Sequence, residues 1–131
     1  MPYVGGAGHD VGMIGKLYSV ILDCPDPRGL AEFYSKLLGW PVRPQGEDWV
    51  WVGESAPYLA FQLAPDHRAP RWPDPEFPQQ YHVDVFVEDI DQADREVLAL
   101  GATRLPGEGE DFRVYADPAG HPFCLIWRVD T

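Results

Sequence analysis

The sequence is short of cysteine and of basic residues. Its 131 residues include only two cysteines, Cys24 and Cys124, too few for the disulfide framework that stabilises many small secreted domains. Ten lysines and arginines stand against twenty-one aspartates and glutamates, so the formal net charge is −11. A surface of that sign repels nucleic-acid phosphates and anionic lipid, and we therefore expect neither nucleic acid nor a membrane as a partner.

Long apolar segments are also missing. No run reaches the roughly 18 apolar residues that a membrane-spanning helix needs, and no segment near the N-terminus resembles a signal peptide. We therefore expect a reduced, cytoplasmic protein. Residues 1–15 are rich in glycine and have little to pack, which predicts a flexible N-terminal arm. The rest of the chain, 16–131, is long enough for a single domain.

The chain does contain an internal repeat. Short segments of the first half match segments of the second half in the same order and at an almost constant offset. The matching pairs include residues 18–20 with 81–83, 46–49 with 109–112, and 61–63 with 123–125. Because the order and the spacing are kept over the whole chain, we infer two copies of one structural unit.

The first copy predicts a strand, a helix and three further strands. An apolar, β-branched segment at 17–24 is typical of a buried strand, and Asp26 followed by proline predicts the N-cap of a helix. Apolar residues spaced as on one helical face continue to Leu38, and Gly39 ends the helix. The following strands are expected near 41–44, 48–53 and 58–64.

The second copy predicts the same elements. Asp89 is the expected N-cap of a helix over 90–100, which follows a strand at 81–88. The remaining strands are expected near 103–106, 111–116 and 122–128. We thus predict an α+β fold of three segments: module one, 16–64; a proline-rich irregular crossover, 65–80; and module two, 81–128.

Several short motifs accompany this order of elements. They are Asp26-Pro27, Phe33-Tyr34, Leu38-Gly39 and the segment Asp117-Pro118-Ala119-Gly120-His121-Pro122-Phe123. Together with the repeat, they resemble the vicinal oxygen chelate superfamily, which includes glyoxalase I, bleomycin-resistance proteins and extradiol dioxygenases. The ending Pro-Phe-Cys-Leu looks most like an uncharacterised glyoxalase-like branch. The resemblance implies two βαβββ modules whose curled mixed sheets enclose a cup, with the helices outside, and a homodimer.

Alternation along the strands assigns side chains to the cup. The large aliphatic and aromatic residues of each strand are expected to meet a helix, which leaves the opposite face for the cup. Four polar residues are expected there, at one repeat-related position in each of four strands: Ser19, Gln62, His82 and Cys124. Asp84 follows on the face of His82. Trp49 and Trp51 share one strand face, and they form an apolar wall of the cup if Val50 and Val52 meet the helix.

A metal site is not predicted at these positions. The resemblance implies that metal-dependent relatives place His and Glu ligands there, whereas only His82 and Cys124 are strong donors in this chain. Asp84 or Asp23 could add a carboxylate, but each lies a full strand period further along. We therefore assign no metal ligand and commit to no cofactor.

For single residues, structural roles compete with functional ones. His82 is as consistent with a hydrogen-bonded internal histidine as with a ligand-facing one. Cys124 fits a small buried hydrophobe better than a nucleophile, and His121 fits a support for its turn better than a ligand contact.

Two functions of different classes follow. The favoured one is binding of a small, partly apolar molecule without a complete metal site; its expected contacts are Ser19, Trp49, Trp51, Gln62, His82, Asp84 and Cys124. The alternative is a metal-assisted lyase, isomerase or dioxygenase in which His82 is the catalytic residue, as a metal ligand or as a general base. Both remain open on the sequence, which does not name the ligand.

Overall fold

The computed structural model describes residues 14–44 and 46–127, and this part of the chain contains two strand–helix–three-strand modules. Residues 1–13 of the predicted N-terminal arm lie outside the described residues. The helices are α1 (Pro27–Leu38) and α2 (Ile90–Ala99). The strands are β1 (Ser19–Cys24), β2 (Val42–Pro44), β3 (Trp49–Val52), β4 (Tyr58–Leu63), β5 (Val83–Phe86), β6 (Thr103–Leu105), β7 (Phe112–Ala116) and β8 (Pro122–Ile126). The predicted order of elements is confirmed.

Both helices begin at the predicted aspartates. The Asp26 carboxylate accepts a hydrogen bond from the Gly29 amide, and Asp89 accepts one in the same way at the start of α2. Helix α1 ends where Gly39 adopts a left-handed conformation with φ of 72°, which glycine reaches without steric cost. Among the described residues, no helix is long and apolar enough to cross a membrane.

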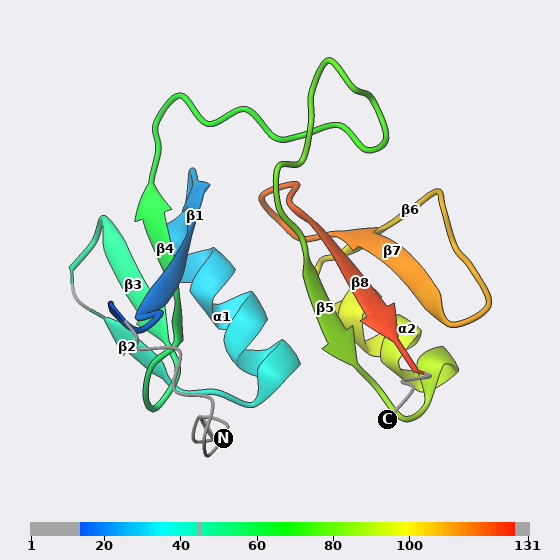
Figure 1. The fold of residues 1–131 in the computed structure, drawn as a ribbon, viewed down its shortest axis with the longest axis horizontal. Coiled ribbons are helices and arrows are strands. Elements are labelled where there is room, and N and C mark those ends of the chain that lie inside the picture. The colour runs from blue at the N-terminus through cyan, green and yellow to red at the C-terminus, as the bar shows by residue number, and fades with distance from the viewer. Residues whose placement is uncertain (1–13, 45, 128–131) are drawn as a thin grey trace.

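Each module forms one four-stranded mixed sheet (Figure 1). The first sheet has the order β1-β4-β3-β2 and the second the order β5-β8-β7-β6. In both sheets the first strand of the module runs parallel to the last one, and the other neighbours are antiparallel. The predicted α+β fold of two repeated βαβββ modules is therefore confirmed. It also places β1 and β5 at exposed sheet edges.

The repeat differs from the sequence alignment in the last strand of each module. In the second sheet, Cys124 lies between Asp84 of β5 and Val114 of β7. In the first sheet, the equivalent position, between the counterparts of Asp84 and Val114, is occupied by Ala60 and not by Gln62. The predicted equivalence of Gln62 and Cys124 is thus wrong by two residues. A slip of two keeps every side chain on its face, so alternation alone could not detect it.

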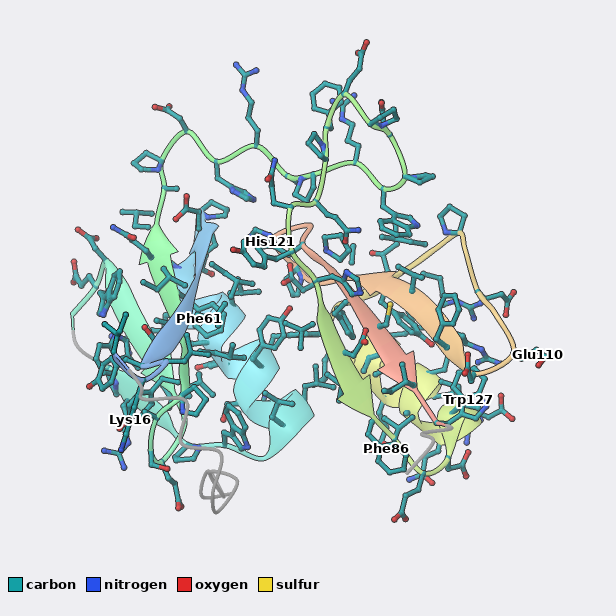
Figure 2. The ribbon with its side chains drawn as sticks, in the orientation of Figure 1. Lys16, Phe61, Phe86, Glu110, His121 and Trp127 are labelled. Carbon is teal, nitrogen blue, oxygen red and sulfur yellow. The ribbon has the colours of Figure 1, made fainter. Side chains whose placement is uncertain are left out.

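Helix α1 packs between the two modules. Its Tyr34 ring stacks on Phe61 of β4 at 5.5 Å, and its Phe33 ring meets Phe123 of β8 edge-on at 5.7 Å. All four side chains are almost fully buried. Figure 1 shows α1 between the strands of the two sheets, and Figure 2 labels Phe61 on the side toward this helix. The helix-facing sides of both sheets therefore share one hydrophobic core.

A polar contact also joins the modules. The buried Tyr34 hydroxyl donates to Asp117 Oδ2 at 2.7 Å, while Asp117 Oδ1 accepts from the backbone amides of Ala119 and His121. Burial raises the pKa of both Tyr34 and Asp117. His121 Nε2 lies 2.6 Å from the Asp23 carbonyl oxygen and must carry the proton, because that oxygen only accepts. The His121 ring thus connects the β7–β8 turn of the second module to β1 of the first module.

Candidate functional site

The strand faces follow the predicted alternation in the second sheet. Val85 is buried in the core, and Val83 packs against it, whereas His82 and Asp84 lie exposed on the opposite face. Cys124, at 7% exposure, belongs to the same face of the neighbouring strand β8. The structure therefore brings three of the predicted site residues together.

The three side chains lie closer together than the sequence predicted. Asp84 and Cys124 are direct partners in the parallel β5–β8 pair, and His82 lies two residues before Asp84. The His82 Nε2 and Asp84 Oδ1 atoms are 3.4 Å apart. One ligand atom from each residue lies within 4.8 Å of the other two. Asp84 lies a full strand period beyond His82, as predicted, but the two-residue slip of β8 places Cys124 level with Asp84 rather than with His82.

An open cavity of about 470 Å³ lies over these side chains. It is lined by His82, Asp84, Cys124, Phe112, Val114, Ile126, Asp111, Gly107 and Trp72. Its base is apolar, since Phe112, Val114 and Ile126 come from the same face of β7 and β8. The polar groups of His82 and Asp84 stand at one side. We call this cavity the module-two pocket.

One wall of the module-two pocket comes from the crossover. The Trp72 indole donates a hydrogen bond of 2.7 Å to the Pro106 carbonyl oxygen, which fixes the ring beside β6. Next to this ring, Gly107 has φ of 111°, a backbone conformation that residues with a side chain rarely adopt. Trp72 therefore both packs beside β6 and lines the module-two pocket.

The Cys124 thiol is protonated at neutral pH. Burial, together with the negative charge of Asp84, raises its pKa to about 11. A thiol with that pKa is a poor nucleophile. The prediction of Cys124 as a small buried hydrophobe therefore agrees with its environment, although its sulfur also borders the pocket.

A second group of predicted residues lies on the first sheet. Val50 and Val52 are fully buried toward α1, so Trp49 and Trp51 lie on the opposite face of the sheet. The condition under which the two tryptophans were predicted to face away from the helix is therefore met. Trp51 contacts Tyr18 edge-on at a centroid distance of 5.3 Å. Its indole N–H is buried and has no hydrogen-bond partner among the described residues. We call this surface the aromatic wall.

Two further predicted residues border the aromatic wall. Gln62 pairs with Trp49, and Ser19 pairs with Tyr58, on the same sheet face. Tyr58 is an aromatic neighbour that the sequence reasoning missed; its place in alternation with Ala60 was the available signal. None of these side chains lines the module-two pocket. Within one chain the predicted set is thus divided between two surfaces.

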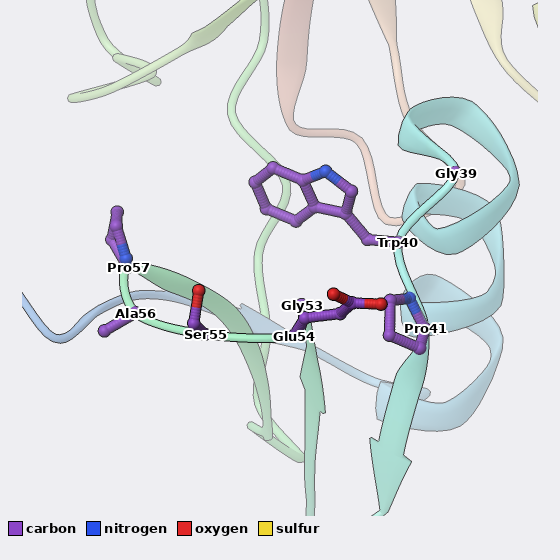
Figure 3. A pocket seen from close by; sticks show the side chains of 8 residues that line it. All are labelled: Gly39, Trp40, Pro41, Gly53, Glu54, Ser55, Ala56 and Pro57. Carbon is purple, nitrogen blue, oxygen red and sulfur yellow. The ribbon is translucent and has the colours of Figure 1, made fainter. Parts of the chain in front are cut away.

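Another hollow, of about 520 Å³, lies at the far end of the first module (Figure 3). Its lining comes from residues 39–41 and 53–57, in the turns that follow α1 and β3. The Trp40 ring stands over it in Figure 3. It contains no predicted site residue, and its only charged lining residue is Glu54. The module-two pocket therefore offers a ligand more polar and ionisable side chains than this hollow does.

Comparison with protein families matches residues 19–126 to a glyoxalase-like domain. A glyoxalase/bleomycin resistance protein/dioxygenase family enzyme from Burkholderia phytofirmans has a similar structure, with a TM-score of 0.66 and 14% identity over 85% of this chain and 97% of that one. The bleomycin-binding protein of Streptomyces verticillus, complexed with copper(II)-bleomycin, has a TM-score of 0.55 and 17% identity over 89% of this chain and 100% of that one.

A fosfomycin resistance protein from Mesorhizobium loti gives a TM-score of 0.65 and 13% identity over 89% of this chain and 94% of that one. At identities this low, the structural similarity establishes a shared fold and nothing more. A search of curated proteins found no significant match. The family match covers most of the chain and agrees with the doubled βαβββ modules. This chain therefore belongs to the glyoxalase-like domain family.

Proposed function

We propose that this protein binds a small, partly apolar molecule in the module-two pocket. The observation that carries the proposal is the composition of the pocket: an apolar base beside two convergent polar side chains, His82 and Asp84. Its volume of about 470 Å³ lies within the range of small-molecule sites, roughly 300–1,000 Å³. The apolar base supplies affinity, and the polar side chains orient the ligand.

The similar structures support the same class of ligand. One is named as a bleomycin-binding protein and another as a fosfomycin resistance protein. Both names refer to a small organic molecule. The shared fold therefore accommodates small molecules, and the pocket of this chain has the size and the mixed lining that such a ligand requires.

The proposal is tested through His82. A thermal-shift screen of small aromatic and acyl compounds identifies a ligand, which is then titrated into the wild type and the His82→Ala variant. We expect affinity to fall about 5- to 30-fold, because one hydrogen bond of roughly 1–2 kcal/mol is lost while the apolar contacts remain. His67→Ala is the matched control, since the His67 ring contacts the Ala119 carbonyl oxygen away from the pocket. Equal affinities in all three proteins would contradict the role of His82.

We further propose that the protein is a homodimer. The edge strand β1 carries Ile21 at 46% exposure beside Tyr18 at 55%, and the edge strand β5 carries Phe86 at 54%. Exposed apolar edges with unpaired backbone groups favour association, and a second copy related by a two-fold axis would cover both. In such a dimer the aromatic wall of one chain could close the module-two pocket of its partner. Ser19, Gln62, Trp49 and Trp51 would then complete the ligand contacts.

A cytoplasmic location is part of the same proposal. Cys24 and Cys124 are both buried and both free. Free, buried thiols are typical of a reducing compartment, where disulfides rarely persist.

A further inference from the structure

The hollow at the far end of the first module has a lining that the proposed function does not use. It is bordered by residues 39–41 and 53–57 and has a volume of about 520 Å³; we call it the Trp40 hollow. Its aromatic side chain is Trp40, and its only charged side chain is the Glu54 carboxylate. We propose that the Trp40 hollow is a second ligand site, which binds a quaternary ammonium group between the Trp40 ring and the Glu54 carboxylate.

The Trp40 ring is positioned by the residues around it. The Ser35 hydroxyl of α1 donates a hydrogen bond of 2.5 Å to the Trp40 carbonyl oxygen, which fixes the backbone just after the helix. The ring lies next to the turn that follows β3, since a Cβ atom on Gly53 would be 3.6 Å from Trp40 Cε3. Trp40 nevertheless keeps 39% of its surface exposed, and Figure 3 shows its ring over the hollow. An aromatic face is therefore available to a ligand without rearrangement.

The Glu54 carboxylate is available to bind a cation. Its turn is fixed through the backbone: Arg43 Nη2 donates to the Glu54 carbonyl oxygen at 3.1 Å, and the Gly53 amide donates to the Pro41 carbonyl oxygen at 2.9 Å. The carboxylate itself forms no ion pair with any residue that the structure describes. In Figure 3 it extends toward Pro41, below the Trp40 ring. The ring and the carboxylate thus border one space, and a cation in that space contacts both.

The charge around the hollow selects a cation. Gly39 lies at the C-terminal end of α1, where the last carbonyl groups of the helix carry a partial negative charge that stabilises a cation beside them. Among the described residues, no lysine or arginine lines the hollow; Lys36, in the last turn of α1, borders a different groove. The whole chain has a formal net charge of −11. An anionic ligand would therefore be repelled.

The lining favours a methylated ammonium over a primary one. A primary ammonium brings three N–H donors, whereas the acceptors among the lining side chains are the Glu54 carboxylate and the Ser55 hydroxyl. The side chains of Pro41, Ala56 and Pro57 are apolar. A quaternary ammonium has no N–H donor to satisfy. Its methyl groups pack against the apolar side chains, and its charge interacts with the indole face and the carboxylate.

Choline is the probe that tests this inference. Its neutral isostere, in which a tert-butyl group replaces the trimethylammonium group, is the ligand control. Each compound is titrated into the whole protein at constant ionic strength, while two-dimensional NMR follows the backbone amides of residues 53–56 and the indole N–H groups of the five tryptophans. The Trp40 indole signal is the one that is missing from Trp40→Leu. We expect choline to shift this signal and those amides in a saturable way, and the isostere to bind at least about tenfold more weakly.

Substitutions separate the two contacts. Trp40→Leu removes the aromatic face and should weaken choline binding about 5- to 30-fold, whereas Trp40→Phe should keep most of the affinity. Glu54→Gln should weaken binding about threefold. Glu110→Gln is the matched control and should change nothing, because Glu110 is exposed in the β6–β7 turn and does not line the hollow. Glu54 is also exposed, so the two glutamate variants test the site even if Trp40→Leu fails to fold.

The proposal is overturned if choline shifts neither the Trp40 indole nor the amides of residues 53–56, or if the neutral isostere binds as tightly as choline. Equal affinities of wild type and Trp40→Leu, or equal losses in Glu54→Gln and Glu110→Gln, would also overturn it. So would choline that shifts only the Trp72 indole, because it would then bind in the module-two pocket. None of these results would contradict the proposed function, since the two cavities share no lining residue.

Discussion

The hydrogen bond between Tyr34 and Asp117 offers the sharpest test of how the two modules are held together. It links α1 of the first module to the β7–β8 turn of the second, across 83 residues of sequence. Tyr34 is fully buried, and Asp117 is 3% exposed. Replacing Tyr34 by phenylalanine removes the hydroxyl but keeps the ring that stacks on Phe61.

We expect Tyr34→Phe to lower the free energy of unfolding by about 1.5–3 kcal/mol, the range for a hydrogen bond to a charged group. The loss should not be larger. Asp117 keeps the two backbone amides of Ala119 and His121, so its carboxylate remains partly compensated. A smaller loss would mean that water replaces the hydroxyl, which the burial of both residues opposes.

Urea denaturation followed by circular dichroism measures this difference. Tyr58→Phe is the matched control, because its hydroxyl lies 3.5 Å from the Glu54 carbonyl oxygen and is near the surface. We expect less than about 0.5 kcal/mol for that variant. If Tyr34→Phe and Tyr58→Phe lose the same stability, the argument for a buried polar link between the modules is refuted.

Burial raises the pKa of Asp117 above its ordinary 3.8. The wild type should therefore be stabilised relative to Asp117→Asn below that pH, and this stabilisation should be lost as the pH rises through the raised pKa. Urea denaturation at several pH values checks this, and a pH-independent difference in stability would contradict it. Burial also raises the pKa of Cys24 to about 11, so iodoacetamide should label it roughly a hundredfold more slowly in native protein than in unfolded protein, as mass spectrometry would show. Ile21→Lys should convert the proposed dimer into a monomer by light scattering, whereas Leu98→Lys on exposed α2 should not; a dimer in both variants would exclude the β1 edge from the interface.

The fold could be predicted from the sequence because every element is specified twice. Asp26 and Asp89 mark the two helix starts, and the structure shows both as N-caps. The sequence pattern of any single helix or strand is a weak signal. Because the two modules repeat one unit, however, each predicted element must occur in both of them. Alternation predicted Val85 on the helix side of its sheet, because a sheet covered by a helix on one side buries the apolar side chains of that face. It left the face of Val50 conditional, and the structure buries Val50 in the core.

The site could be predicted only in part. Alternation has a period of two residues, so it assigns faces but cannot fix the level at which neighbouring strands pair. The level of Cys124 beside Asp84 therefore came from the structure, and so did their proximity to His82. Trp72 could not be assigned to the pocket because it belongs to the irregular crossover, whose path depends on tertiary contacts such as the hydrogen bond to Pro106.

Ile126 provides the most direct test of binding in the module-two pocket. It lines the pocket and is only partly buried, so Ile126→Trp should fill the cavity without disturbing the core. The strongest compound from the thermal-shift screen is titrated calorimetrically into wild type, Ile126→Trp and the control Leu98→Trp. We expect one molecule per chain and equal affinity for wild type and Leu98→Trp, with at least about a tenfold loss for Ile126→Trp. Equal affinity for all three proteins would show that the ligand binds elsewhere and would contradict the proposed function.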